Sequence, residues 1–186
     1  MDYAKTPHEY GAIYFHAGAQ HDPGWSHALA LEVGAPGSVS ASGLYAVALR
    51  SAGGASELPL VVTGASPVEV LVSLPTFSYQ AAAGAKDAAG ATPLISPLTV
   101  RTGRLRDQPD IGNDLALLRW LELQGVTHDV TCDHHVHHVG VDALRGYAVV
   151  VTGSHPAYAS GTTLDALETY LRQGGGLLYL GGGGFR

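Results

Sequence analysis

The sequence has little charge, one cysteine and no basic cluster, and each shortage excludes a class of function. Only 14% of the 186 residues are charged, the formal net charge is -6, and no run of Lys and Arg is interleaved with aromatic residues. Binding to phosphates requires such a basic surface, so no nucleic-acid partner is expected. Cys132 is the only cysteine, which makes an intramolecular disulfide impossible.

Long hydrophobic runs are also missing. No segment approaches the ~20 apolar residues that cross a bilayer, and residues 1–7 lack the apolar core of a signal peptide. We therefore expect a cytoplasmic protein without a membrane partner. Hydrophobic residues make up 46% of the chain, which is enough for one sizeable core or for a small domain joined to a partial one.

Composition changes near residues 64–67, which predicts two domains, residues 1–65 and residues 66–186. The first is predicted to be part of a β-sandwich, because short runs rich in β-formers alternate with Gly, Pro and Ser. Tyr45, Val47 and Leu49 are expected to face its core. The predicted strands are Ala12–His16, Leu29–Val33, Gly43–Leu49 and Leu58–Val62.

In the second domain, apolar strands alternate with helical patterns. One helix is predicted from Asp114 to Gln124, with Asn113 as its cap, and another begins at a capping-box-like pair, Thr162 and Asp165. This order predicts an open α/β sheet of flavodoxin-like character, of the class I glutamine-amidotransferase type. Residues 81–109 show no period and are expected to form a loop. The predicted strands are Val68–Leu74, Val126–Thr131, Tyr147–Thr152 and Gly176–Leu180.

His155 is the first candidate for a functional residue. It follows the strand Tyr147–Thr152 in a Thr-Gly-Ser-His-Pro turn, and open α/β sheets bind ligands beyond the carboxyl ends of their strands. A histidine there suits a general base, a ligand or an oxyanion donor. Ordering of the turn ahead of Pro156 explains it equally well, so both interpretations stay open.

The segment from Cys132 to His138 is rich in possible metal ligands, and imidazole with thiolate or carboxylate suits zinc, iron or nickel. We expect it to lie in a loop between a strand and a helix, where a histidine-rich segment also binds metals weakly and without purpose. An inert thiol is favoured over a nucleophile for Cys132, because no tight Gly-x-Cys-x-Gly turn surrounds it. Gly181–Gly184 fit a tight turn better than a phosphate-binding loop.

Three motifs carry a family resemblance. They are Leu-Pro-Thr-Phe-Ser-Tyr-Gln-Ala at residues 74–81, Val-Thr-Gly-Ser-His-Pro-x-Tyr at residues 151–158, and the glycine-rich strand at residues 174–185. In this order they resemble the large (β) subunit of N,N-dimethylformamidase. The β-rich segment before residue 65 is similar to the region preceding that domain, so the match is to a middle portion of a longer protein.

The resemblance implies hydrolysis of small amides by water at a mononuclear iron that two tyrosines and a glutamate hold. Hard phenolate and carboxylate oxygens suit ferric iron, which acidifies a bound water and polarises a carbonyl. Tyr79 matches one of these tyrosines and is the metal ligand that carries over. His155 is the matching catalytic candidate, on the same edge of the sheet. The resemblance also implies a small subunit or a second copy of the chain as a partner.

Two departures from the family pattern weaken this expectation. Where the family has His-Pro-Glu-Tyr, residues 155–158 read His-Pro-Ala-Tyr, so Ala157 replaces the expected carboxylate ligand. The segment 81–109 also contains no tyrosine for the second phenolate. One ligand of three holds iron poorly. We therefore expect a relative that is truncated at its C-terminus or degenerate, with weakened or lost activity. The alternatives are a non-catalytic subunit-association domain and metal binding by His134–His138.

Overall fold

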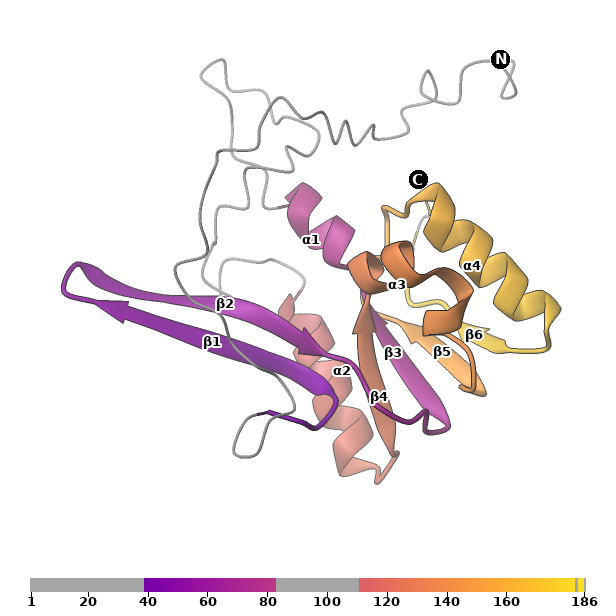
Figure 1. Cartoon of the computed structure of the whole chain (residues 1–186), viewed down its shortest axis with the longest axis horizontal. Coiled ribbons are helices and arrows are strands. Elements are labelled where there is room, and N and C mark those ends of the chain that lie inside the picture. Colours follow the sequence, from indigo (N-terminus) through magenta and orange to yellow (C-terminus); the bar gives the residue numbers. More distant parts are fainter. Residues whose placement is uncertain (1–38, 83–110, 183, 186) are drawn as a thin grey trace, which may run out of the picture.

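The computed structural model describes residues 39–82, 111–182 and 184–185, and these ranges form a mixed α/β structure (Figure 1). The predicted strands Ala12–His16 and Leu29–Val33 lie outside the described residues, as does nearly all of the predicted loop 81–109. The elements are β1 (Gly43–Ser51), β2 (Gly54–Val62), β3 (Val70–Leu74), α1 (Thr76–Ala82), α2 (Ile111–Leu123), β4 (His128–Cys132), α3 (Asp133–Val139), η4 (Gly140–Ala143), β5 (Val149–Thr152), α4 (Gly161–Arg172) and β6 (Gly176–Leu178).

Four parallel strands form the central sheet in the order β4-β3-β5-β6. All four strands predicted for this part of the chain are present, although each is shorter or shifted by up to two residues. The chain passes from β3 to β4 on one side and then returns to β5 on the other side of β3. The strand order therefore reverses between β3 and β5.

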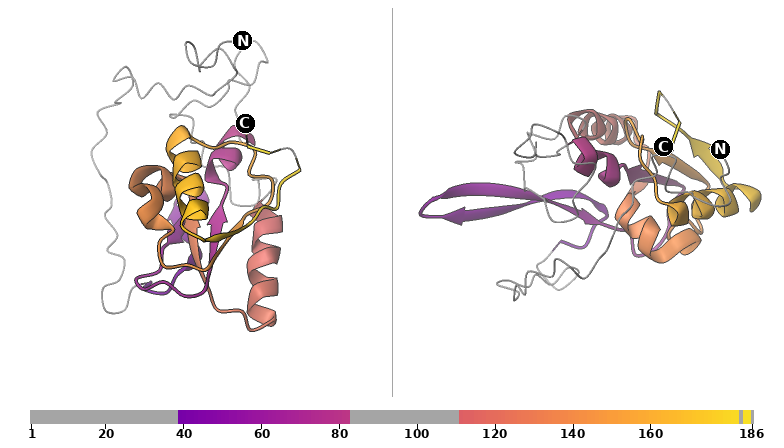
Figure 2. Two further views of the ribbon diagram at one scale, coloured as in Figure 1. Left: turned by 90° about the vertical axis from the view of Figure 1, so that its right-hand side faces the viewer. Right: turned by 90° about the horizontal axis from the view of Figure 1, so that it is seen from above.

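Helices cover both faces of the sheet. Successive residues of β3 point to opposite faces, and each face packs against different helices. Leu71 packs with residues of α3 and α4, whereas Val72 and Leu74 pack with α1 and α2. Figure 2 shows α2 on one side of the sheet and α3 with α4 on the other. The same alternation applies to β5, where the neighbouring residues Val150 and Val151 point to opposite faces and are both buried.

Strands β1 and β2 form an antiparallel hairpin whose register pairs Gly43 with Val62. Half-buried Tyr45 and Val47 alternate with exposed Ala46 and Ala48, as predicted. At its base, the Ser42 hydroxyl accepts a hydrogen bond from the Val130 amide at 2.7 Å, which ties the hairpin to the edge of the sheet. Within the described residues, the segment 1–65 contains this hairpin and no second layer, so the sandwich and the domain division stay predictions.

Two predicted helix caps are wrong. Helix α2 begins at Ile111, which places Asn113 inside its first turn. Helix α4 is capped by Ser160, whose hydroxyl accepts a hydrogen bond from the Thr163 amide at 3.1 Å, and Thr162 lies within the helix. Because Ser160 comes just before the first helical residue, it is the side chain that reaches the unpaired amides of that turn.

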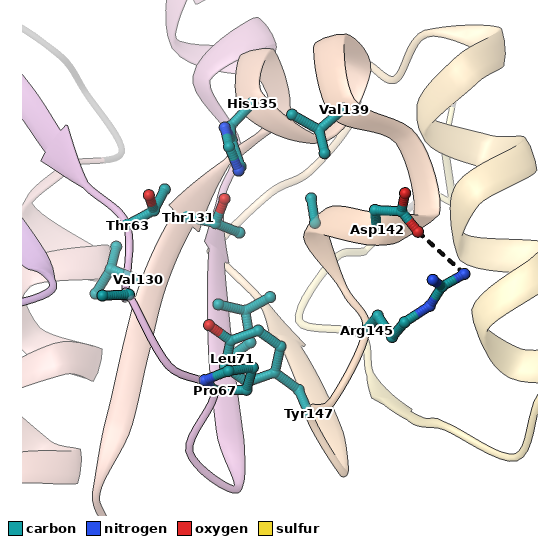
Figure 3. Close-up of a pocket in the computed structure, with 13 residues that line it drawn as sticks. Thr63, Pro67, Leu71, Val130, Thr131, His135, Val139, Asp142, Arg145 and Tyr147 are labelled. Carbon is teal, nitrogen blue, oxygen red and sulfur yellow. Dashed lines mark ion pairs between the residues drawn. The ribbon is translucent and has the colours of Figure 1, made fainter.

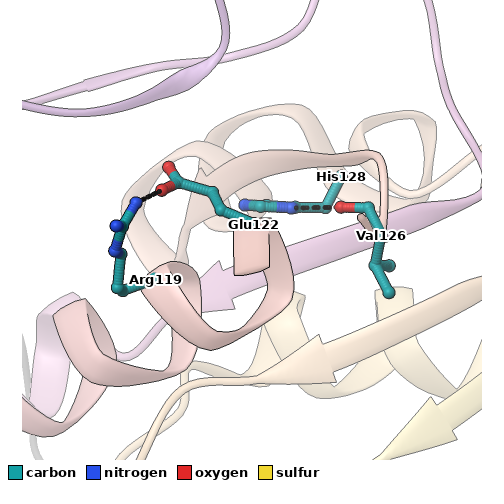
Figure 4. Close-up of polar contacts among 4 residues, drawn as sticks. All are labelled: Arg119, Glu122, Val126 and His128. Carbon is teal, nitrogen blue, oxygen red and sulfur yellow. Dashed lines mark hydrogen bonds and ion pairs between the residues drawn. The ribbon is translucent and has the colours of Figure 1, made fainter. Parts of the chain in front are cut away.

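The end of α2 leads directly into β4 (Figure 4). Gly125 takes a positive φ of 69° and ends the helix as predicted. Two local contacts accompany this turn: Arg119 pairs with Glu122 at 3.2 Å, and His128 Nδ1 donates to the Val126 carbonyl at 2.9 Å. No helix in the described ranges is long and apolar enough to cross a membrane.

The histidine-rich segment is a helix, where the sequence predicted a loop. Helix α3 starts at Asp133, directly after β4, and carries His134, His135, His137 and His138. Asp133 in the first turn and the histidines in the last turn both suit the helix dipole. Its single buried apolar residue is Val136, which explains why no helical period was visible.

Candidate functional site

The candidate site lies at the carboxyl ends of β3 and β5, where the strand order reverses. Open α/β sheets bind ligands at such a point because the connections leave in opposite directions and open a crevice. Helix α1 follows β3 after Pro75, and the loop 153–160 follows β5. Tyr79 lies in α1 and His155 in this loop, so the two predicted site residues follow two strands that are adjacent in the sheet.

Tyr79 is buried and forms a hydrogen bond with a carboxylate from a third segment. Its side chain is 7% exposed, and its hydroxyl donates to Asp114 Oδ2 of α2. Asp114 is fully buried, and its Oδ1 accepts a hydrogen bond from the Ser154 amide at 2.5 Å. The chain Tyr79–Asp114–Ser154 thereby connects α1 and α2 to the turn that carries His155.

Ser78 provides a second connection between the same segments. Its buried hydroxyl accepts hydrogen bonds from the amides of Ala157 and Tyr158, at 3.0 and 3.2 Å. Gly153 permits this close approach, since a Cβ there would lie 2.3 Å from the Pro75 ring. The two matched motifs are therefore physically joined: Ser78 contacts residues 157 and 158 directly, and Tyr79 is connected to residue 154 through Asp114.

His155 is exposed and has a φ of 53°, which makes it the one non-glycine residue with positive φ in the described ranges. This conformation is disfavoured for a residue with a Cβ, and it persists where neighbouring contacts fix the backbone. The Ala157 amide donates to the His155 carbonyl at 2.7 Å, and the flanking Ser154 amide is held by Asp114. The backbone strain fits both a functional histidine and an ordered turn.

Asp133 lies at the end of the third strand, β4, and is also buried. Its Oδ2 accepts a hydrogen bond from the Phe77 amide at 3.2 Å. Burial raises the pKa of Asp133 to about 7, and the nearby Asp114 carboxylate adds to the rise, whereas the bond from Phe77 opposes it. The candidate site therefore contains two buried acidic side chains, one of which titrates near neutral pH.

The histidines of α3 make individual contacts. His134 Nδ1 lies 2.6 Å from the Thr76 hydroxyl, and its ring packs on Phe77 at 4.5 Å between centroids. His137 Nδ1 lies 2.8 Å from the Oγ of Ser160, the N-cap residue of α4. Burial lowers the pKa of His134 and of His135. The pKa of the Cys132 thiol is raised by burial, which favours the inert-thiol interpretation.

These residues do not by themselves fit an iron site of two phenolates and a carboxylate. The Tyr79 hydroxyl donates to Asp114, and both Asp114 oxygens already accept hydrogen bonds. Among the described residues, no three His, Cys, Asp or Glu side chains are grouped so as to hold a metal. Metal ligation by Tyr79 or by His134–His138 and catalysis by His155 stay predictions.

Sequence reasoning missed the roles of Asp114 and Ser78, and it considered Asp133 only as one of the possible metal ligands of residues 132–138. One signal for Asp114 was present, because residues 111, 114, 118 and 121 share one face of α2 and the other three are apolar. An acidic residue on such a face requires a buried partner. Nothing in the sequence shows which side chain provides that partner.

Comparison with known proteins agrees with these motifs. Residues 1–185 match the family model described as "N,N-dimethylformamidase beta subunit-like, C-terminal". The chain belongs to this family. The N,N-dimethylformamidase beta subunit of Paracoccus aminophilus is 28% identical, and that of an Alcaligenes species is 27% identical. Each match covers 98% of this chain and 30% of the relative, so the chain spans less than a third of the relatives' length.

The lengths of the matches reveal a difference within the family. Both extend over 233 aligned positions, whereas this chain has 186 residues. The two dimethylformamidase subunits therefore carry tens of residues inside the matched region that this chain lacks.

Proposed function

We propose that this chain is a dimethylformamidase-like α/β region that retains the framework of a small-amide site and has weak or no amidohydrolase activity of its own. The observation that carries the proposal is the hydrogen bond from Tyr79 to Asp114. In this bond the hydroxyl of Tyr79, the tyrosine that matches the family motif, holds Asp114, which in turn holds the loop of His155. Both side chains are buried from solvent. Ala157, in the place of the family's glutamate, supports the same conclusion.

The fold supports the location of this site. The observed order β4-β3-β5-β6 corresponds to four consecutive strands of the flavodoxin-like order 2-1-3-4-5, whose ligand crevice lies between strands 1 and 3. In this chain these are β3 and β5. We infer a flavodoxin-like sheet with an ancestral small-amide site at the Tyr79 and His155 edge.

Iron, where it is bound in such a site, supplies Lewis-acid activation of the amide carbonyl and of water. The described residues lack the required donor set, so we derive no step through the metal. What the chain itself supplies is an exposed imidazole at His155, positioned by Asp114 and Ser78 through the backbone of residues 154–158. We propose that this imidazole orients a small amide or a water molecule.

The test is to measure metal and activity in the untagged chain. We expect well under one iron per chain by elemental analysis, and no release of dimethylamine from N,N-dimethylformamide above a buffer control. Stoichiometric iron together with hydrolysis that His155→Ala abolishes would contradict the proposal.

A matched pair of variants then examines the missing ligand. Ala157→Glu restores the carboxylate that the family motif carries, and we expect it to raise iron retention. Ala159→Glu places the same charge two residues further along and should leave iron retention unchanged. Equal iron in both variants would show that residue 157 does not face the metal position.

A second candidate function is association with another subunit, and one surface favours it. Trp120 and Leu123 are 55% and 65% exposed, and with Ala116 they share the face of α2 that points away from the sheet core. The relatives are named as subunits. Light scattering of the wild type and of a Trp120→Gln, Leu123→Gln variant tests this candidate: a loss of mass in the variant supports it, and a monomeric wild type contradicts self-association.

A further inference from the structure

Helix α2 presents a second, apolar face to solvent. One of its faces packs on the sheet, whereas Trp120 and Leu123 point away from it and are more than half exposed. On the opposite side of the sheet, a cavity of about 230 Å³ lies beside η4, and its rim carries the ion pair of Asp142 and Arg145 at 3.0 Å (Figure 3). Burying a charged rim costs the hydration of its charges, so the exposed face of α2 is the stronger candidate for a contact surface.

Three residues of this face are spaced by four positions, namely Gly112, Ala116 and Trp120. Residues at this spacing form one ridge on the surface of a helix. The side chains are small at Gly112 and Ala116, which are both exposed, and large at Trp120. A Cβ at Gly112 would meet no other atom of the described residues within 4 Å, so the space above it is open. The ridge thus has a hollow at one end and an indole ring at the other, equally far from Ala116.

This shape is complementary to itself. A two-fold axis that passes beside Ala116 reverses the direction of the helix, and it brings Trp120 of each copy to Gly112 of the other, about 6 Å from the axis along the helix. The two ridges then pack side by side, as in the commonest class of helix crossings. A second copy of the chain therefore supplies both the ring that fills the hollow and the hollow that receives the ring.

Charge does not oppose such a contact, although the whole chain carries a formal net charge of -6. Arg119 and Glu122 lie along one flank of the ridge and pair with each other at 3.2 Å (Figure 4). Their charges cancel, so two copies of this face meet without net repulsion. A strongly acidic or basic partner would gain no counter-charge here. Exposed tryptophan is also enriched at the centres of protein interfaces.

On the basis of the association function proposed above, we propose that α2 is the interface of a homodimer. The two helices cross antiparallel at Ala116, and each Trp120 ring packs in the space above Gly112 of the other copy. Helix α2 has 13 residues and is about 20 Å long, so the contact is at the small end of specific interfaces. We therefore expect a weak dimer, with a Kd of about 10–500 μM.

Sedimentation equilibrium of the untagged full chain, at concentrations up to about 1 mM, measures this dimer. Gly112→Leu fills the space that receives Trp120, and leucine is also the better helix former. We expect this variant to raise Kd at least about 30-fold without losing stability in urea unfolding. Gly161→Leu makes the same change at an exposed position of α4 with open space around it, and should dimerise as the wild type does. A monomeric wild type, or equal dimerisation of the two variants, would overturn the proposal.

Cysteine variants test the orientation of the helices, in a Cys132→Ser background. At the axis the two copies of residue 116 face each other within the ~7 Å between Cα atoms that a disulfide spans, so Ala116→Cys should form a linked dimer on mild oxidation. Leu123→Cys lies on the same face, but its two copies are about 20 Å apart in an antiparallel crossing and should not link. Linkage of both variants alike, or none in Ala116→Cys, would overturn the antiparallel crossing.

The outcomes separate this contact from the functions proposed above. A dimer that survives Gly112→Leu and does not link through Ala116→Cys would overturn the α2 contact and leave self-association standing. A monomeric wild type would overturn both, and it would leave this face to a different protein. The iron and hydrolysis measurements concern the strand ends, and neither result changes what is expected of the dimer.

Discussion

Replacing Tyr79 by Phe removes the hydroxyl that donates to Asp114 while keeping the ring in the core. Hydrogen bonds to charged groups contribute about 1.5–3 kcal/mol, and the carboxylate that loses this donor has no exposed surface through which water replaces it. We therefore expect the free energy of unfolding to fall by about 2 kcal/mol. For a chain of 186 residues this lowers Tm by roughly 4–8 °C.

Urea unfolding of Tyr79→Phe against the wild type measures this loss, and Tyr45→Phe is the matched control. The Tyr45 hydroxyl donates to the Ala41 carbonyl at 3.0 Å on the exposed hairpin, so its removal should cost less than about 1 kcal/mol. If Tyr79→Phe were as stable as Tyr45→Phe, the phenol would not be holding Asp114. If Tyr79→Phe instead lost bound iron, the structural role assigned to this residue would be refuted.

The remaining predictions concern other buried or strained positions. Because the pKa of Asp133 is raised from 3.8 to about 7, its contribution to the free energy of unfolding is full below pH 4 and is lost as the pH rises toward 7, by at most about 4 kcal/mol. Asp133→Asn should therefore reduce the dependence of the free energy of unfolding on pH, measured by urea unfolding from pH 4 to pH 8. An unchanged pH dependence would show that another group causes it. Gly153→Ala should destabilise the chain by about 2 kcal/mol or more, since its Cβ would lie 2.3 Å from Pro75. In the control Gly161→Ala, the added Cβ has open space and should not destabilise the chain in this way. Equal thermal unfolding temperatures of the two variants would contradict the close approach at Gly153. Ser160→Ala should cost about 1 kcal/mol and Thr162→Ala much less, and the reverse order in urea unfolding would restore Thr162 as the cap.

The sheet was largely predictable from the sequence because its two central strands, β3 and β5, are local runs of apolar residues. Val149, Val150 and Val151 are consecutive, which identifies a strand covered on both faces without knowledge of its neighbours. The family was also recognisable, since its motifs are short and local. Helix α3 was not predictable, because Val136 is its only buried apolar residue and its remaining residues carry no apolar period.

The contacts of the candidate site could not be predicted for a different reason. Tyr79, Asp114 and Ser154 lie on three elements separated by 35 and 40 residues, and only the folded sheet brings them together. Sequence reasoning located Tyr79 and His155 at one sheet edge from the positions of the strand ends. The assignment of Tyr79 to a metal rests on the family resemblance and stays a prediction, and the sequence gives no sign of the hydrogen bond from its hydroxyl to Asp114.

The amides of Ser154, Ala157 and Tyr158 all donate to side chains of α1 or α2, and none of the three bonds belongs to a helix or sheet ladder. These amides can exchange their protons with solvent deuterium only when the loop lifts from both helices. Their exchange should therefore follow one common rate, set by the opening of the loop as a unit rather than by the unfolding of the sheet. We therefore expect the loop that carries His155 to open as one unit, because two side chains, Ser78 and Asp114, hold all three amides.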